Sequence, residues 1–147
     1  MPTVTFDTID DPPSESLQPI HEGLVAYDRT QLADRPPAES CRVAVLARAD
    51  DGAVIGGIVG ELFYDWLHVS TLWVDESHRK QNIGSQLVSA LEGAAITHGV
   101  FHSHLETTSF QALGFYQKQG YEIFGQLEGK PAGHTWYYLK KDLEENS

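Results

Sequence analysis

The sequence contains a single cysteine, a single methionine and only 10 lysines and arginines against 21 aspartates and glutamates. Because Cys41 cannot form an intramolecular disulfide, the composition favours an intracellular protein. The formal net charge of −11 argues against binding to nucleic-acid phosphates or to an anionic membrane, since both require a basic surface. The longest apolar run, residues 53–60, is far shorter than the ~20 residues that span a bilayer. The first residues also lack the pattern of a secretory signal. We therefore expect a small, acidic, cytoplasmic protein.

No internal repeat or break in composition divides the 147 residues, so we expect a single domain over residues 1–147. Apolar residues at spacings of three and four predict three helices, the first capped by Ser14, over residues 14–27, 83–98 and 110–119. Runs rich in β-branched or alternating apolar residues predict strands over residues 3–6, 41–48, 54–64, 67–74, 100–106, 121–127 and 135–140. This order predicts a mixed α/β (α+β) fold with an antiparallel front half and a later crossover.

The segment 72–85 is the most informative part of the chain. It reads LWVDESHRKQNIGS, in which an apolar strand runs into a polar turn and the turn opens an amphipathic helix near Gly84. Unpaired backbone N–H groups and the positive end of a helix dipole meet at such a turn, and together they favour a bound phosphate or pyrophosphate. Gly84 allows close approach to the backbone, and Asn82 tolerates a positive φ. The alternative interpretation is an ordinary helix start that binds nothing.

Residues 79–84, Arg-Lys-Gln-Asn-Ile-Gly, resemble the [RQ]-x-x-G-x-[GA] motif of the GNAT superfamily of acetyl-CoA-dependent N-acetyltransferases. The sequence departs from the motif at Asn82, where the family usually has glycine. Residues 107–121 resemble the family's second motif, N-x-x-A-x-x-[FL]-Y-x-[KR]-x-G-[FY], at a fitting distance from the first. The resemblance implies a mixed sheet of six to seven strands with splayed central strands, flanked by about four helices. It also implies acetyl-CoA as the co-substrate.

The resemblance assigns the binding of acetyl-CoA to two segments. The turn would hold the pyrophosphate, and Leu72 and Val74 would offer backbone groups to the pantetheine arm. Ser109 stands where many members have asparagine, and its hydroxyl is expected on the same arm. The backbone N–H groups around Leu72 and Trp73 are expected to stabilise the oxyanion. The full set of expected cofactor-binding residues is Leu72, Trp73, Val74, Arg79, Lys80, Gln81, Asn82, Ile83, Gly84, Ser85 and Ser109.

The resemblance also assigns the chemistry of group transfer. Tyr116 matches the position of the family's general acid, and a phenol with a pKa near 10 can protonate a departing thiolate. His68 is the expected general base, because some members carry a basic glutamate at about this place and imidazole titrates near neutral pH. Glu61 and Glu106 are rival bases. The other interpretations are a buried aromatic at Tyr116 and a half-buried structural histidine at His68.

Neither a metal ion nor a covalent intermediate is expected. His102 and His104 would share one face of a strand, but the sequence shows no third ligand beside them, so we expect no metal. Cys41 belongs to an early strand, away from both motifs, which argues against an acetyl-cysteine intermediate. We therefore expect direct transfer within a ternary complex.

The expected acceptor is a primary amine of a small molecule or peptide. Tyr27, Tyr64, Trp66 and Trp136 are expected to line its site, although core or interface packing explains such aromatics equally well. Negative charge would attract cationic amines, but the same acidity fits solubility or a saline cytoplasm. The apolar segment 136–139 fits a homodimer interface or a packed core strand.

Two other functions remain open at this point. A non-catalytic acyl-CoA sensor or interaction module would keep the cofactor groove without turnover. A nucleotide-phosphate binder would use the same helix start for a different ligand.

Overall fold

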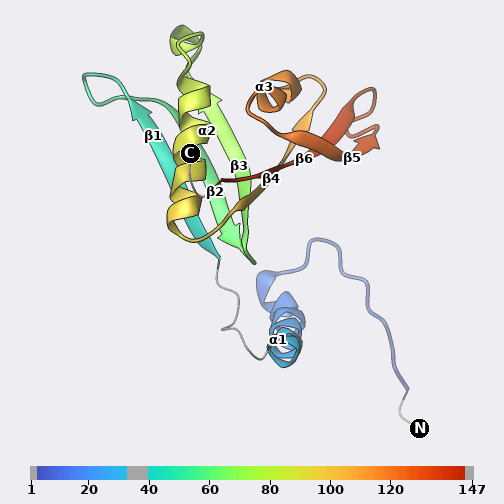
Figure 1. The fold of residues 1–147 in the computed structure, drawn as a ribbon. Coiled ribbons are helices and arrows are strands. Elements are labelled where there is room, and N and C mark those ends of the chain that lie inside the picture. Colours follow the sequence, from blue (N-terminus) through green and yellow to red (C-terminus); the bar gives the residue numbers. More distant parts are fainter. Residues whose placement is uncertain (1–2, 33–39, 145–147) are drawn as a thin grey trace. The chain divides into compact units, whose positions relative to one another are not determined.

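A computed structural model describes residues 3–32 and 40–144, and the chain divides into two compact units at residue 38 (Figure 1). The first unit contains helix α1 (Ser14–Gln31). The second unit contains a six-stranded sheet and the helices that pack with it. None of the described helices is long and apolar enough to cross a lipid bilayer.

Two predictions for the first unit are wrong. Residues 3–6 form no strand, because an alternating run becomes a strand only where a neighbouring strand accepts its hydrogen bonds. Ser14 is the first helical residue rather than the cap, since Pro13 takes the N-cap position with no side-chain hydrogen bond. The hydroxyl of Ser16 donates to the Pro13 carbonyl at 2.6 Å instead.

The sheet of the second unit has the strand order β1-β2-β3-β4-β6-β5. Its strands are β1 (Cys41–Arg48), β2 (Val54–Phe63), β3 (Trp66–Val74), β4 (His102–Thr108), β5 (Glu122–Glu128) and β6 (Thr135–Asp142). The first three form an antiparallel meander, and β4 runs parallel to β3. The mixed α/β class, the antiparallel front half and the crossover are therefore confirmed.

Helix α2 (Ile83–Thr97) forms the crossover between β3 and β4, and α3 (Leu113–Lys118) lies between β4 and β5. A short 3-10 helix, η1 (Glu76–His78), precedes α2. The described residues thus contain three α-helices, one fewer than the resemblance implied.

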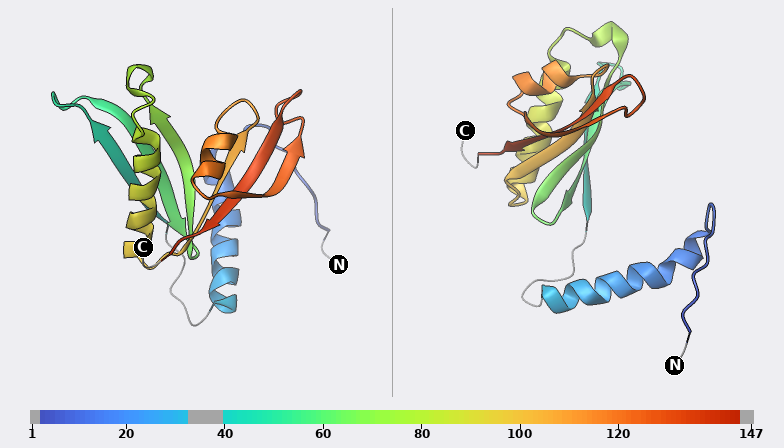
Figure 2. Two further views of the ribbon diagram at one scale, coloured as in Figure 1. Left: turned by 45° about the horizontal axis from the view of Figure 1, so that its top comes forward. Right: turned by 90° about the vertical axis from the view of Figure 1, so that its right-hand side faces the viewer.

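Helix α2 packs against β1, β2 and β3 and forms the core with them (Figure 2). A Cβ atom at Gly60 would lie 2.7 Å from Leu67 Cδ1 and 3.0 Å from Leu91 Cδ2. Because real Cβ atoms do not approach that closely, glycine at this position lets the helix settle onto the sheet.

A cluster of hydrogen-bonded polar side chains connects α2 to β4 and β6 through Tyr121, the residue before β5. Tyr121 donates to Glu92 at 3.0 Å, and its hydroxyl also lies 2.7 Å from the Ser103 hydroxyl. Lys141 Nζ lies 2.9 Å from a Glu92 carboxylate oxygen. Burial raises the pKa of the Tyr121 hydroxyl, so tyrosine stays a donor here.

The central strands separate after a short parallel stretch. β3 and β4 pair only where Leu67–Val69 meet Ser103–Leu105, and beyond this point Figure 2 shows the two halves of the sheet diverging. The predicted splay is therefore confirmed. Along the open part, the β4 side of β3 has backbone groups without a strand partner.

A β-bulge at Ser70 lies at the start of this opening. Val59 pairs with Thr71 and Gly60 pairs with Val69, so Ser70 is the extra residue. A bulge reverses the alternation of faces along a strand. His68 lies between the core residues Leu67 and Val69 and so faces away from α2, and after the bulge Leu72 again packs against the helix-covered core.

Candidate active site

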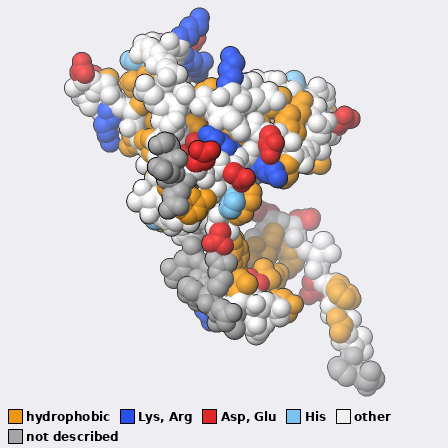
Figure 3. All heavy atoms as spheres, in the orientation of Figure 1, with side chains coloured by type: hydrophobic (Ala, Val, Ile, Leu, Met, Phe, Trp, Pro, Cys, Tyr) orange, Lys and Arg blue, Asp and Glu red, His pale blue; other side chains and the backbone are white. Residues whose placement is uncertain are grey.

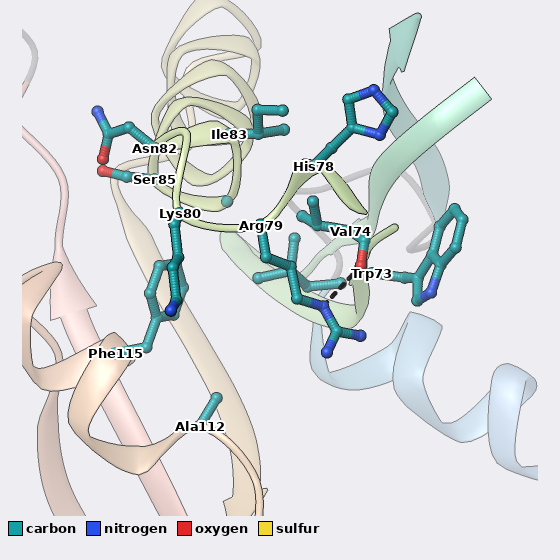
Figure 4. A pocket seen from close by; sticks show the side chains of 12 residues that line it. Trp73, Val74, His78, Arg79, Lys80, Asn82, Ile83, Ser85, Ala112 and Phe115 are labelled. Atoms are coloured by element: carbon teal, nitrogen blue, oxygen red, sulfur yellow. Dashed lines mark hydrogen bonds between the residues drawn. The ribbon is translucent and has the colours of Figure 1, made fainter. Parts of the chain in front are cut away.

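A cleft of about 630 Å³ opens between the end of β3, the start of α2 and α3. Figure 4 shows the turn between β3 and α2 on one side of this cleft and the α3 residues on the other. It is lined by Leu72, Trp73, Val74, His78, Arg79, Lys80, Asn82, Ile83, Gly84, Ser85, Ala112 and Phe115. Nine of the eleven residues expected from the sequence to bind the cofactor thus lie around one cavity.

The turn presents a series of free backbone donors to this cleft. Within the described part of the chain, the N–H groups from Lys80 to Ser85 have no protein acceptor, and the next one, of Gln86, donates to the Asn82 carbonyl at 3.1 Å. Asn82 has φ 64° and ψ 17°, the left-handed conformation expected for it, and Lys80 has φ 69°. Consecutive N–H groups in such a turn, together with a helix N-terminus, form a binding concavity for anions.

Hydrogen bonds at its β3 end hold the turn in place. Asp75 caps η1 by accepting from the Ser77 backbone N–H at 3.2 Å. Hydrogen bonds from the Ser77 side chain and from His78 lower the pKa of the Asp75 carboxyl. Arg79 Nε donates to the Val74 carbonyl at 3.1 Å, so the guanidinium lies beside the end of β3 (Figure 4). Figure 3 shows basic side chains at the top of the molecule, over this turn.

Gly84 also has a role in packing within the protein. A Cβ atom there would lie 3.3 Å from Phe115 Cζ, so the glycine also lets α3 pack against the first turn of α2. The ring of Phe115 in turn lies at 5.1 Å from that of Tyr116, edge to face. The packing of the turn and the position of Tyr116 are therefore linked.

A second cleft of about 580 Å³ follows the opening between β3 and β4. It shares Leu72, Arg79 and Ala112 with the first, so the two form one continuous depression. Tyr116 and Glu106 both line it. Burial raises the pKa of Tyr116, and no described residue is hydrogen-bonded to its hydroxyl, which leaves a protonated donor available to a ligand.

His68 and Glu106 form a pair on the sheet face that α2 does not cover. His68 Nε2 donates to the Glu106 carboxylate at 2.7 Å, and both side chains are half-buried. The ring of His104 stacks on that of His68 with centroids 4.7 Å apart. Burial, followed by repulsion from His68, lowers the pKa of His104. Two of the three residues weighed as general bases are thus in contact, whereas Glu61 pairs with His68 only in strand register.

Other predicted residues lie outside the two clefts. Ser109 lines neither, and its hydroxyl accepts from the Thr135 N–H at 3.2 Å. Its contact with the pantetheine, like that of Gln81 with the pyrophosphate, stays a prediction. Cys41 is exposed at the start of the edge strand β1. Three residues that line the first cleft were not expected from the sequence: His78, which directly precedes the first motif, and Ala112 and Phe115, which fall inside the second.

The predicted acceptor-site aromatics are distributed over several elements. Trp66 begins β3 and stacks on His102 with centroids 4.9 Å apart, while Tyr64 lies in the preceding turn. Trp136 lies on β6 and pairs with Thr108 on β4, and Lys130 Nζ lies 4.2 Å from the centroid of its ring. Tyr27 lies on α1, in the other unit. Trp66 neighbours the His68 face, since its ring also lies 5.7 Å from that of His104, centroid to centroid.

Residues 136–139, weighed as a dimer interface or a core strand, belong to β6. This strand lies between β4 and β5, and Leu139 is fully buried. The pairing partners of its backbone are therefore within the chain, and the homodimer stays a prediction.

Comparison with known proteins agrees with this arrangement. The sequence matches the Acetyltransferase (GNAT) family over residues 7–121. A blasticidin-S acetyltransferase of Streptomyces morookaense is 38% identical over 121 residues, which cover 82% of this chain and 88% of that protein. An acetyltransferase of Agrobacterium fabrum (strain C58) is 29% identical over 128 residues, covering 87% and 91%.

A solved structure has the same fold over nearly the whole chain. The crystal structure of an acetyltransferase from Bacillus cereus ATCC 14579 is 32% identical, with a TM-score of 0.84, and covers 93% of this chain and 98% of that one. Both sequence motifs, the splayed sheet and these relatives agree, and the chain belongs to the GNAT acetyltransferase family.

Proposed function

We propose that this protein transfers the acetyl group of acetyl-CoA to a primary amine by direct attack in a ternary complex. The observation that carries the proposal is the row of free N–H groups from Lys80 to Ser85 beside a cleft that continues to Tyr116 and Glu106. An anion site joined to a proton donor and a carboxylate–imidazole pair suits a cofactor with a diphosphate at one end and a thioester at the other.

The donor is held by backbone groups along its length. The N–H groups of the turn, with Arg79 and Lys80, bind the diphosphate, and their charge complements it in an otherwise acidic protein. The pantetheine lies in the opening beyond Val69, where β3 has lost β4 as its partner. In that position it satisfies backbone groups that would otherwise have only water.

The chemistry needs one proton acceptor and one proton donor. The amine nitrogen attacks the thioester carbonyl carbon, and His68, held by Glu106, accepts the proton that the amine loses. When the C–S bond breaks, Tyr116 protonates the departing sulfur to give free CoA. Tyr116 is suited to this role because burial keeps its hydroxyl protonated, and general acid catalysis contributes about 10²–10⁴-fold.

The acceptor is a small-molecule amine. The relative that is 38% identical is named for the acetylation of blasticidin S, which makes antibiotics with free amino groups the first compounds to test. The ring of Trp66 contacts that of His104, which stacks on His68, and it supplies an aromatic surface against which a planar or cationic acceptor packs.

The test combines calorimetry with CoA and a thiol-release assay across a panel of amines that includes blasticidin S. We expect saturable CoA binding and thiol release with at least one amine. His68→Gln, which cannot accept the proton, should lower turnover at least tenfold, while His98→Gln, at the exposed end of α2, should not. A Glu106→Gln variant that loses much more activity than His68→Gln would make Glu106 the base.

A non-catalytic acyl-CoA sensor is the second candidate, because the free N–H groups of the turn would bind CoA whether or not Tyr116 and His68 support turnover. Tight CoA binding with no thiol release from any amine would favour it. Absence of CoA binding at millimolar concentration would contradict both functions.

A further inference from the structure

Three side chains of metal-ligand type meet on the sheet face that α2 does not cover. His68 on β3 pairs in register with His104 on β4, and Glu106 lies two residues further along β4, on the same face. One ligand atom from each of the three lies within 4.8 Å of the others. From the sequence, His102 was the expected neighbour of His104 on one face of a strand. In the structure His102 Nδ1 lies 2.9 Å from Asp142 Oδ1, and the neighbour of His104 in the cluster is His68 of β3.

We infer that His68, His104 and Glu106, the His–His–Glu cluster, bind Zn²⁺ or a chemically similar divalent transition-metal ion. Two imidazole nitrogens and one carboxylate oxygen are the three protein ligands of open zinc sites, in which water takes the fourth position. Imidazole ligands favour Zn²⁺, Ni²⁺ and Cu²⁺, whereas Mg²⁺ and Ca²⁺ need mostly oxygen ligands.

The distances suit such a site after small side-chain rotations. Tetrahedral coordination at about 2.0–2.1 Å places ligand atoms roughly 3.4 Å from one another. The His68–Glu106 separation of 2.7 Å must lengthen, and the wider separations must shorten. Both changes are side-chain rotations, for which half-burial of all three residues leaves room, and the stacked imidazoles must also tilt so that their in-plane lone pairs converge on the ion.

The charges around the cluster also favour a cation. Glu61 pairs in register with His68 from β2 and adds a second carboxylate near the site. Lys140, which pairs with His104 from β6, holds its ammonium over the ring of Phe124, 5.9 Å from the centroid. The cluster thus holds one carboxylate, that of Glu106, and a second acidic residue, Glu61, lies on the neighbouring strand.

Metal binding has a consequence for catalysis that rests on the proposed function. When an ion is coordinated by the lone pair of His68, this imidazole can no longer accept the proton of the amine. Coordination of Glu106 also removes the carboxylate that holds His68. Zn²⁺ is therefore expected to inhibit acetyl transfer reversibly, and a chelator should restore the rate.

The site is tested first without any turnover. Calorimetric titration of the full-length, metal-free protein with Zn²⁺ should give one site with a micromolar or lower Kd, and Mg²⁺ should give no binding at the same concentrations. His104→Gln and, independently, Glu106→Gln should each raise the Kd for Zn²⁺ at least tenfold. His102→Gln is the matched control on the same strand and should keep the wild-type Kd. Zn²⁺ binding that is equal in wild type and His104→Gln, or weaker than millimolar in wild type, overturns the site.

The inhibitory consequence is tested separately. Thiol release is measured with and without Zn²⁺, and each variant is compared with its own metal-free rate. Wild type and His102→Gln should be inhibited, whereas His104→Gln should be inhibited only at Zn²⁺ concentrations at least tenfold higher. Zn²⁺ binding without inhibition overturns the role of His68 as base but not the site. A metal-free enzyme that shows no turnover overturns the proposed function, while the titration still decides the site.

Discussion

Asn82 provides a direct test of how the turn binds a diphosphate. Its backbone is left-handed, and its side chain makes no capping hydrogen bond, so the residue contributes conformation rather than a contact. Asn82→Ala keeps a Cβ atom but loses the tolerance of asparagine for this conformation. Asn82→Gly is the matched control, because glycine adopts the conformation freely.

The expected magnitude follows from the cost of a positive φ. An ordinary L-residue in the left-handed region costs about 1–2 kcal/mol, and asparagine costs less. Asn82→Ala should therefore lower the free energy of unfolding by about 1 kcal/mol, and Asn82→Gly should change it by only a few tenths. If the turn of the Asn82→Ala variant relaxes to another conformation in the free protein, CoA must restore the left-handed conformation at residue 82 when it binds. The same ~1 kcal/mol then raises the Kd for CoA roughly fivefold.

Two measurements on the three proteins check this reasoning. Urea denaturation gives the free energy of unfolding, and calorimetry gives the Kd for CoA. We expect wild type and Asn82→Gly to bind alike and Asn82→Ala to bind more weakly. Equal CoA affinities together with equal free energies of unfolding for all three proteins, or weaker binding by Asn82→Gly than by Asn82→Ala, would refute the idea that the conformation of residue 82 presents the N–H groups.

Three further variants test the catalytic acid and the core. Tyr116→Phe should lower turnover in the thiol-release assay about 10²-fold or more and leave CoA affinity unchanged. Because burial raises the pKa of Tyr116, ionisation of its hydroxyl should not lower the rate of thiol release at any pH below 10. A fall in rate below pH 10 that is present in the wild type and absent in Tyr116→Phe would contradict this. Gly60→Ala should destabilise the protein by about 1–3 kcal/mol through its clash with Leu67, and an unchanged urea midpoint would mean that α2 moves away freely. Lys141→Met should cost roughly 2–3 kcal/mol in the same assay, because it leaves the carboxylate of Glu92, 11% exposed, without its cation; a neutral result would show that water replaces the ammonium.

Periodicity predicted the elements of the second unit well, because each buries one face in a shared core. The expected strand over residues 41–48 coincides with β1, and the expected helix over residues 83–98 ends one residue beyond α2. The expected strand over residues 3–6 failed for the opposite reason. Four alternating residues have strand propensity, but nothing in the local sequence shows whether a partner strand exists.

The turn that is proposed to bind the diphosphate and the His68–Glu106 pair also differed in how far the sequence predicted them. The turn was predictable, because its donors, its left-handed Asn82 and its helix start are contiguous in sequence. The pairing of His68 with Glu106, 38 residues away, was not, since it depends on the register of two parallel strands joined by a helix. Register is a tertiary property, and a shift of one residue would have placed Glu106 on the buried face.

The bulge at Ser70 explains how one strand serves both the core and the chemistry. Without the bulge, regular alternation through residues 68, 70 and 72 would place Leu72 on the face of His68, and the end of β3 would present apolar side chains where the proposed base lies. With it, Leu67 and Val69 before the bulge and Leu72 after it all pack toward α2. The pairing of β3 with β4 ends at Val69, immediately before the bulge. The same local irregularity therefore keeps the core continuous, leaves His68 on the open face and marks the point at which the sheet parts.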